Sequence, residues 1–214
     1  MSEESQIVAN DQSNNSFKSI FLSKKKSIIS SVIVILLVLF SYFFYSDYKK
    51  DQKIKISEKF NFVIINFKIK NPEISISKMK EIIDTKDPTY SPLALYFLLD
   101  NNLLNNKTEV NKYFDILIND VDLDKEIKNL IIYKKGLYNS ETASEEEMLN
   151  IFKPLINKDN LWRSHALYII AEYFFSKNEM QKSKEFFEKI LELKNSNPQI
   201  KLETQKRLQR DFSA

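Results

Sequence analysis

The chain has 214 residues with a formal net charge of +3, one glycine, one histidine and no cysteine. Without cysteine it has neither a disulfide framework nor a thiolate site, and one glycine excludes both the G-x-G-x-x-G dinucleotide loop and the P-loop. Nearly balanced charge gives no basis for a nucleic-acid partner, and a single histidine excludes a histidine-based metal cluster.

The first elements in chain order are a polar tail and an apolar helix. Residues 1–26 are rich in Ser, Asn, Gln and Glu, and we expect a disordered cytoplasmic tail. No charge interrupts residues 28–45, and a helix over residues 27–46 matches the roughly 30 Å of bilayer hydrocarbon. The run exceeds the apolar core of a signal peptide, and an aromatic cluster follows it instead of a small-residue cleavage site. The sequence therefore predicts a retained transmembrane helix that contacts membrane lipid.

Lysines flank the apolar segment on both sides, so the positive-inside count does not separate its two ends. Lys24, Lys25 and Lys26 abut the apolar run, and a long C-terminal part is translocated largely regardless of its charge. We therefore expect the N-terminus in the cytoplasm and residues 47–214 on the other side.

Residues 47–214 carry apolar side chains at helical spacing, and we expect no strand there. Proline and asparagine signals, such as Ser91-Pro92, divide this part into short helices. Ser144 and Glu147 have the spacing of a capping box at a helix start. Three aspartates at residues 120–124 begin like a calcium loop but lack its glycine and its final glutamate, so we interpret them as another helix start.

The short helices repeat. The aromatic anchors Phe114, Phe152 and Phe187 are spaced by 38 and 35 residues, near the tetratricopeptide (TPR) period of about 34, and Met79 marks a weaker copy. The predicted fold is all-α: a single N-terminal transmembrane helix, then a TPR-like α-solenoid of about 3 to 4 degenerate helix pairs. Residues 198–212 are expected to form the C-terminal capping helix.

The last pair, residues 164–176 and 179–194, matches the TPR pattern best. Its large, small and aromatic positions fall on Leu167, Ile170, Ala171, Phe174, Ser183 and Phe187. Asn178 takes the turn position that requires positive φ. In the third pair Gly136 takes the small position and is expected to face Met148. In the second pair that position is Leu98 and the turn is at Asn105. Pro154, in the second helix of the third pair, should kink or end that helix.

No constellation of polar groups supports catalysis, and we expect no enzyme, cofactor, metal or small-molecule substrate. Ser164 is adjacent to His165 and cannot reach it in the geometry that a nucleophile and its base require. Repeats of this kind bind protein. On the first helix of the last pair, one face carries the candidate protein-binding groove, His165, Tyr168, Glu172 and Phe175. Two interpretations stay open: these side chains anchor a partner, or they pack on a neighbouring repeat or on the C-terminal helix.

The order of elements, the segment Asn-Leu-Trp-Arg-Ser-His-Ala-Leu at residues 160–167 and the pair Phe186-Phe187 carry a resemblance. Over nearly its whole length the chain resembles the bacterial inner-membrane TPR-like family of ancillary Sec translocon subunits (YfgM-like), particularly its alphaproteobacterial members. The resemblance implies a single-pass inner-membrane protein with a periplasmic repeat domain. It also implies Sec translocon subunits and a periplasmic chaperone as partners. The alternative is a membrane-anchored TPR scaffold for another cell-envelope assembly complex.

Overall fold

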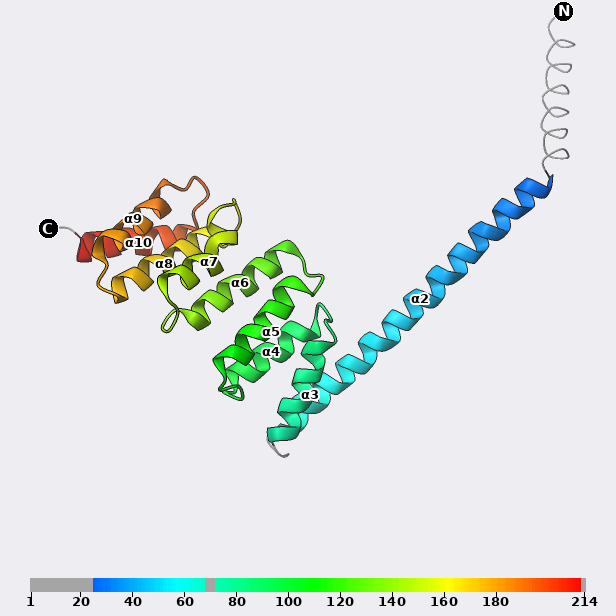
Figure 1. Cartoon of the computed structure of the whole chain (residues 1–214). Helices are drawn as coiled ribbons and strands as arrows, with labels where there is room; N and C mark the ends of the chain where they lie inside the picture. Colours follow the sequence, from blue (N-terminus) through cyan, green and yellow to red (C-terminus); the bar gives the residue numbers. More distant parts are fainter. Residues whose placement is uncertain (1–24, 68–71, 213–214) are drawn as a thin grey trace, which may run out of the picture. The chain divides into compact units, whose positions relative to one another are not determined.

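The computed structural model describes residues 25–67 and 72–212, so the predicted tail lies almost entirely outside the described residues. Within those ranges the regular structure is helical throughout, which confirms the all-α prediction (Figure 1). The helices are α2 (Lys25–Asn66), α3 (Pro72–Asp84), α4 (Tyr90–Asp100), α5 (Lys107–Asn119), α6 (Lys125–Asn139), α7 (Glu145–Ile156), α8 (Arg163–Ser176), α9 (Met180–Glu192) and α10 (Pro198–Asp211).

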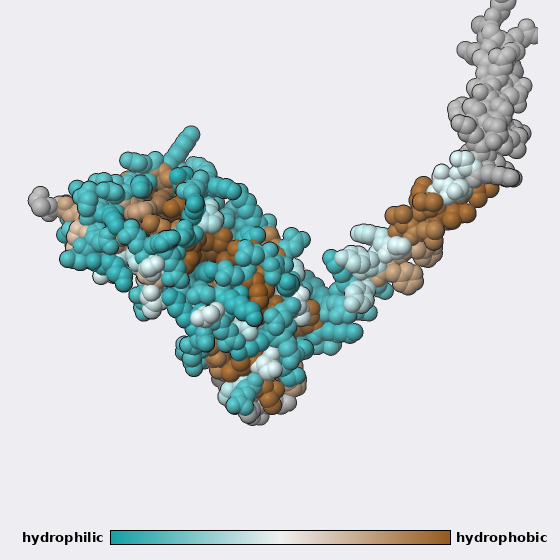
Figure 2. Space-filling view, viewed as in Figure 1, coloured by the Kyte–Doolittle hydropathy of each residue, from teal (hydrophilic) through white to brown (hydrophobic). Residues whose placement is uncertain are grey.

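The chain divides into two compact units, residues 1–55 and residues 56–214. Helix α2 contains the whole predicted span, and it is long and apolar enough to cross a membrane. Its large apolar side chains between residues 29 and 45 are all exposed, from 48% at Leu36 to 75% at Phe44. They form the brown section of this helix in Figure 2.

The second unit is a series of helices packed against their neighbours in sequence, as in an α-solenoid. The last turns of α2 supply Phe60 and Val63 to the first core cluster, which extends through α3, α4 and α5. A second cluster joins α6, α7 and α8, and a third joins α8, α9 and α10. Each helix thus buries one face against the next.

The last predicted pair is confirmed as α8 and α9. Asn178 has a φ of 62°, and the N–H groups of Asn178 and Glu179 donate to Phe175 and Phe174 carbonyls at 3.0 and 2.9 Å. This is the hydrogen-bond pattern of a Schellman turn, which satisfies carbonyl groups at a helix end. The helices cross closely because Ala171 and Ser183 are small and fully buried, and Ser183 Oγ donates to the Ala171 carbonyl at 2.8 Å.

The second predicted pair differs from the expectation, because α4 has its more extensive contacts with α3 and not with α5. Ser91 is fully buried, and its Oγ donates to the Ile82 carbonyl of α3 at 2.9 Å. Ser91-Pro92 therefore does not break a helix; it lies in the first turn of α4, where proline is tolerated. The left-handed turn residue is Asn102, with a φ of 53°, and not Asn105.

The third pair, α6 and α7, crosses at Gly136 as expected, but the facing side chain is Phe152. A Cβ built on Gly136 would lie 2.0 Å from Cζ of that ring, so only glycine fits, whereas Met148 is not among the nearest neighbours. The backbone N–H of Glu147 donates to Ser144 Oγ at 3.2 Å, which confirms the serine half of the capping box. Helix α7 ends at Ile156, two residues after Pro154.

Candidate protein-binding surface

The four residues of the predicted groove lie on α8, which begins after a loop held by Asn160. The Asn160 side chain donates to the Leu155 carbonyl at 2.8 Å and accepts from the Trp162 N–H at 2.9 Å. Tyr173, on the opposite side of α8, donates its hydroxyl to the Ala143 carbonyl at 3.0 Å. These bonds fix the rotation of α8, and its predicted groove residues are all half-buried.

His165 packs in the direction of the preceding repeat. Its ring lies 5.4 Å from the Trp162 ring and 5.9 Å from the Tyr133 ring of α6. Burial lowers the pKa of His165, an effect that the backbone carbonyl of Leu161 opposes, so this side chain favours the neutral form more than a free histidine does. His165 lines a cleft of about 710 Å³ together with Trp162 and the loop that precedes α10.

Tyr168, Glu172 and Phe175 lie where α8 meets α9 and the C-terminal helix α10. The ring centroid of Tyr168 is 5.4 Å from that of Phe187 on α9, and the centroid of Phe175 is 6.0 Å from that of Phe212, which follows α10. Burial raises the pKa of Tyr168, and the Glu172 carboxylate raises it further. The structure thus brings three of the four predicted residues into one contact surface, and this surface is covered by the C-terminal helix.

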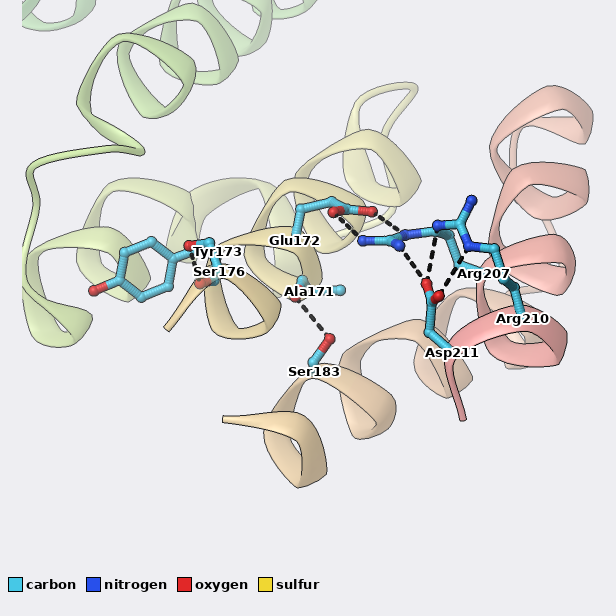
Figure 3. A network of polar contacts seen from close by, with 8 residues as sticks. All are labelled: Ala171, Glu172, Tyr173, Ser176, Ser183, Arg207, Arg210 and Asp211. Carbon is cyan, nitrogen blue, oxygen red and sulfur yellow. Dashed lines mark hydrogen bonds and ion pairs between the residues drawn. The ribbon is translucent and has the colours of Figure 1, made fainter. Parts of the chain in front are cut away.

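Arg207 of α10 is the central charge of this contact (Figure 3). Its Nε and Nη2 donate to the two carboxylate oxygens of Glu172 at 2.7 and 2.6 Å, and its Nη1 donates to Asp211. The guanidinium also lies 4.3 Å from the centroid of the Phe175 ring, within the range of a cation–π interaction. The hydrogen bonds to Glu172 raise the pKa of Arg207 above its already high ordinary value.

Sequence reasoning missed Arg207, Asp211 and Phe212 as members of this surface. Leu202, an apolar residue within the predicted capping helix, is 46% exposed. The available signal was the i, i+4 spacing of Arg207 and Asp211, which places both on one side of a helix. Nothing in the sequence, however, links Arg207 to a carboxylate 35 residues away.

A second, more polar cleft of about 1070 Å³ lies between α5 and the N-terminal end of α7. Its charges are mixed, and Lys135 Nζ lies 2.7 Å from Asp115 Oδ1. Asn111, which lines this cleft, exchanges two amide hydrogen bonds of 3.0 and 2.8 Å with Asn139, and these bonds link α5 to α6. Within residues 25–67 and 72–212, no group of three or more His, Cys, Asp or Glu side chains is placed to hold a metal ion.

Comparison with protein-family models, with curated proteins and with solved structures gives no match for this chain. The family resemblance therefore stays a prediction, and the functional argument depends on the helices and contacts described above.

Proposed function

We propose that this chain is a membrane-anchored, TPR-like protein-binding module that serves as an ancillary factor of the Sec translocon. It would link exported polypeptides to periplasmic chaperones from a single-pass position in the bacterial inner membrane. One observation carries the proposal: an exposed apolar helix of membrane length precedes a helical repeat domain, whose last unit holds half-buried aromatic side chains against the C-terminal helix.

The anchoring part of the proposal rests on the cost of the exposed section of α2 in water. An apolar surface over residues 29–45, interrupted only by Ser30, Ser31 and Ser41, is larger than the patches that soluble monomers expose, and a lipid environment removes this cost. An anchored domain also has a raised effective concentration beside a membrane channel, so a weak binding surface becomes sufficient there.

Orientation is tested first, because the chain has no cysteine and a single introduced thiol is therefore unique. In spheroplasts, a membrane-impermeant maleimide should label Thr142→Cys, at an exposed position in the loop before α7, without permeabilisation. Ser13→Cys in the tail should react only after the membrane is opened. The reverse pattern would place the repeat domain in the cytoplasm and would end the translocon proposal.

Partner identity is tested by crosslinking from native membranes. A photo-crosslinking amino acid at Leu161, which is 72% exposed beside the His165 cleft, should capture Sec translocon subunits and a periplasmic chaperone. The same amino acid at Glu188, exposed on α9, is the matched control and should capture less of both. Capture of cell-wall or outer-membrane assembly proteins in their place would favour the scaffold alternative.

A further inference from the structure

Helix α10 covers the predicted groove with unusually little buried surface of its own. Of its 14 residues, only Thr204 is fully buried, whereas α8 buries seven. Its contacts with the third core cluster come from Ile200, Leu208 and Phe212, which are only partly buried. The residues that it covers are more apolar: Phe187 is fully buried, and Tyr168 and Phe175 are half-buried beneath it.

Much of this contact depends on one charged side chain. Arg207 is 14% exposed and makes two hydrogen bonds to Glu172 while its guanidinium lies over Phe175 and, at 5.9 Å, near Phe187. A bidentate arginine–carboxylate pair is both strong and geometrically selective. The pair crosses from α10 to α8, so it lasts only while α10 stays docked.

We infer that α10 is an internal occupant of a helix-binding groove on α8 and α9, and that a partner helix of the same chemistry displaces it. The occupant defines what the groove takes: an amphipathic helix with apolar residues at the positions of Ile200, Leu208 and Phe212 and an arginine at the position of Arg207. The inference rests on the proposed function, since it names the kind of partner that the same α8 surface binds.

Competition follows from the arrangement. A tethered segment acts at an effective concentration of roughly millimolar, so a free helix of equal intrinsic affinity binds the wild-type chain weakly. The apparent affinity of such a helix equals its intrinsic affinity multiplied by the fraction of chains in which the groove is open. Weakening α10 alone, without changing α8 or α9, should therefore strengthen binding of a free helix.

The test uses the full-length chain in detergent and a fluorescein-labelled peptide of residues 198–212 as the probe. Arg207→Ala removes the crossing pair from the chain's own α10, while the peptide keeps its arginine. We expect the peptide to bind Arg207→Ala at least tenfold more tightly than it binds the wild-type chain. Arg210→Ala is the matched control, because Arg210 is 66% exposed and its hydrogen bonds reach only Asp211 of the same helix; it should change the affinity less than twofold.

Two further measurements keep the result decisive. Adding Glu172→Gln to Arg207→Ala should abolish most of the gain, because the peptide's arginine loses its charged acceptor. Hydrogen exchange of Arg207→Ala should speed up in α10 and stay slow in α8 and α9. An affinity equal to wild type, an equal gain in Arg210→Ala, or loss of protection throughout α8 and α9 would overturn the inference. Since no translocon component is present, the assay can fail while the Sec proposal stands, and the reverse also holds.

Discussion

Two regions of the repeat domain show how side-chain size decides which helices pair: the crossing of α8 with α9, and the contacts of α4 with α3 and α5. In the last pair, Ala171 and Ser183 let two consecutive helices approach until a serine hydroxyl reaches a facing backbone carbonyl. At the corresponding positions of the second pair, Leu98 and Val110 are large and fully buried. Helix α4 uses Ser91 for the same kind of contact, but on α3.

Close pairing therefore follows the small residue and not the position in the repeat. Where the small residue faces the predicted partner, the pair forms; in the second pair the small residue Ser91 contacts α3, and α3 is the main neighbour of α4. This explains why one end of the repeat domain resembles the TPR pattern more than the other. Four predictions test this comparison, from the largest expected effect to the smallest.

The largest effect is expected from Ala171→Leu, which gives the last crossing the side chain of the second. The site is fully buried against α9, so the added atoms force the helices apart. Overpacking of this kind costs typically 1–3 kcal/mol, and we expect about 3 kcal/mol of unfolding free energy to be lost. Urea unfolding of the full chain, followed by circular dichroism, measures it.

The control for Ala171→Leu is Gln181→Leu, at an exposed position on α9. It adds a leucine where no neighbour has to move and should change stability by less than about 0.5 kcal/mol.

The reverse substitution, Leu98→Ala in the second pair, does not create a second close pair. It leaves a cavity in the first core cluster and should cost about 2 kcal/mol. A stabilised Leu98→Ala chain would contradict the role given to side-chain size.

Gly136→Ala tests the third crossing, which achieves a close approach with glycine and an aromatic ring. Its Cβ would meet the Phe152 ring at 2.0 to 2.5 Å, and that ring is fully buried. The strain outweighs the gain in helix propensity of about 1 kcal/mol, so we expect a net loss of about 2 kcal/mol in urea unfolding.

Phe152→Leu in the same chain should relieve the clash. The two losses would then be clearly non-additive, as expected for residues in contact. Additive losses would show that the Phe152 ring does not clash with the side chain introduced at residue 136.

These positions also show how much of the fold the sequence predicted. The last pair and the left-handed turn that joins its helices were predicted, because local conformation at Asn178 and side-chain size at Ala171 and Ser183 follow from the residue types themselves. The partner of Ser91 was not predicted, because periodicity gives the buried face of a helix but not which neighbour covers it.

The candidate site divides in the same way. The side of α8 that carries Tyr168 and Phe175 follows from helical spacing, so this face could be predicted. The contact of Glu172 with Arg207 depends on two long side chains meeting across a turn and a helix. That meeting depends on where α10 docks, which no local pattern in the sequence specifies.

A smaller effect is expected from removing the two buried serine hydroxyls. Ser183→Ala and Ser91→Ala each delete one hydrogen bond to a facing carbonyl and leave the small volume unchanged. A typical hydrogen bond contributes about 1 kcal/mol, and we expect a loss of that size at both sites in thermal or urea unfolding. Clearly unequal losses would mean that the two crossings are not held by the same chemistry.

The smallest effect concerns acid and the ion pairs of the N-terminal region. Glu109 accepts from Lys80 at 2.6 Å and Glu81 accepts from Lys59 at 2.7 Å, and these hydrogen bonds lower the pKa of both carboxyls. A lowered folded pKa contributes stability above the unfolded value, about 4.3 for glutamate, and this stability is lost as the pH falls through the folded value. The Lys59–Glu81 pair is solvent-exposed and the Lys80–Glu109 pair is about one third exposed, so each should contribute roughly 0.5 kcal/mol.

Urea unfolding of wild type and of Lys59→Ala between pH 6 and pH 3 measures this contribution. The wild-type curve should fall more steeply below about pH 4.3, since Lys59 is the main cause of the lowered pKa of Glu81. Parallel curves would show that the Lys59 pair adds no stability between α2 and α3. In that case the apolar contacts of Phe60 and Val63 would hold the end of α2 on the repeat unaided, and the N-terminal end would differ from α10, where a charge crosses the contact.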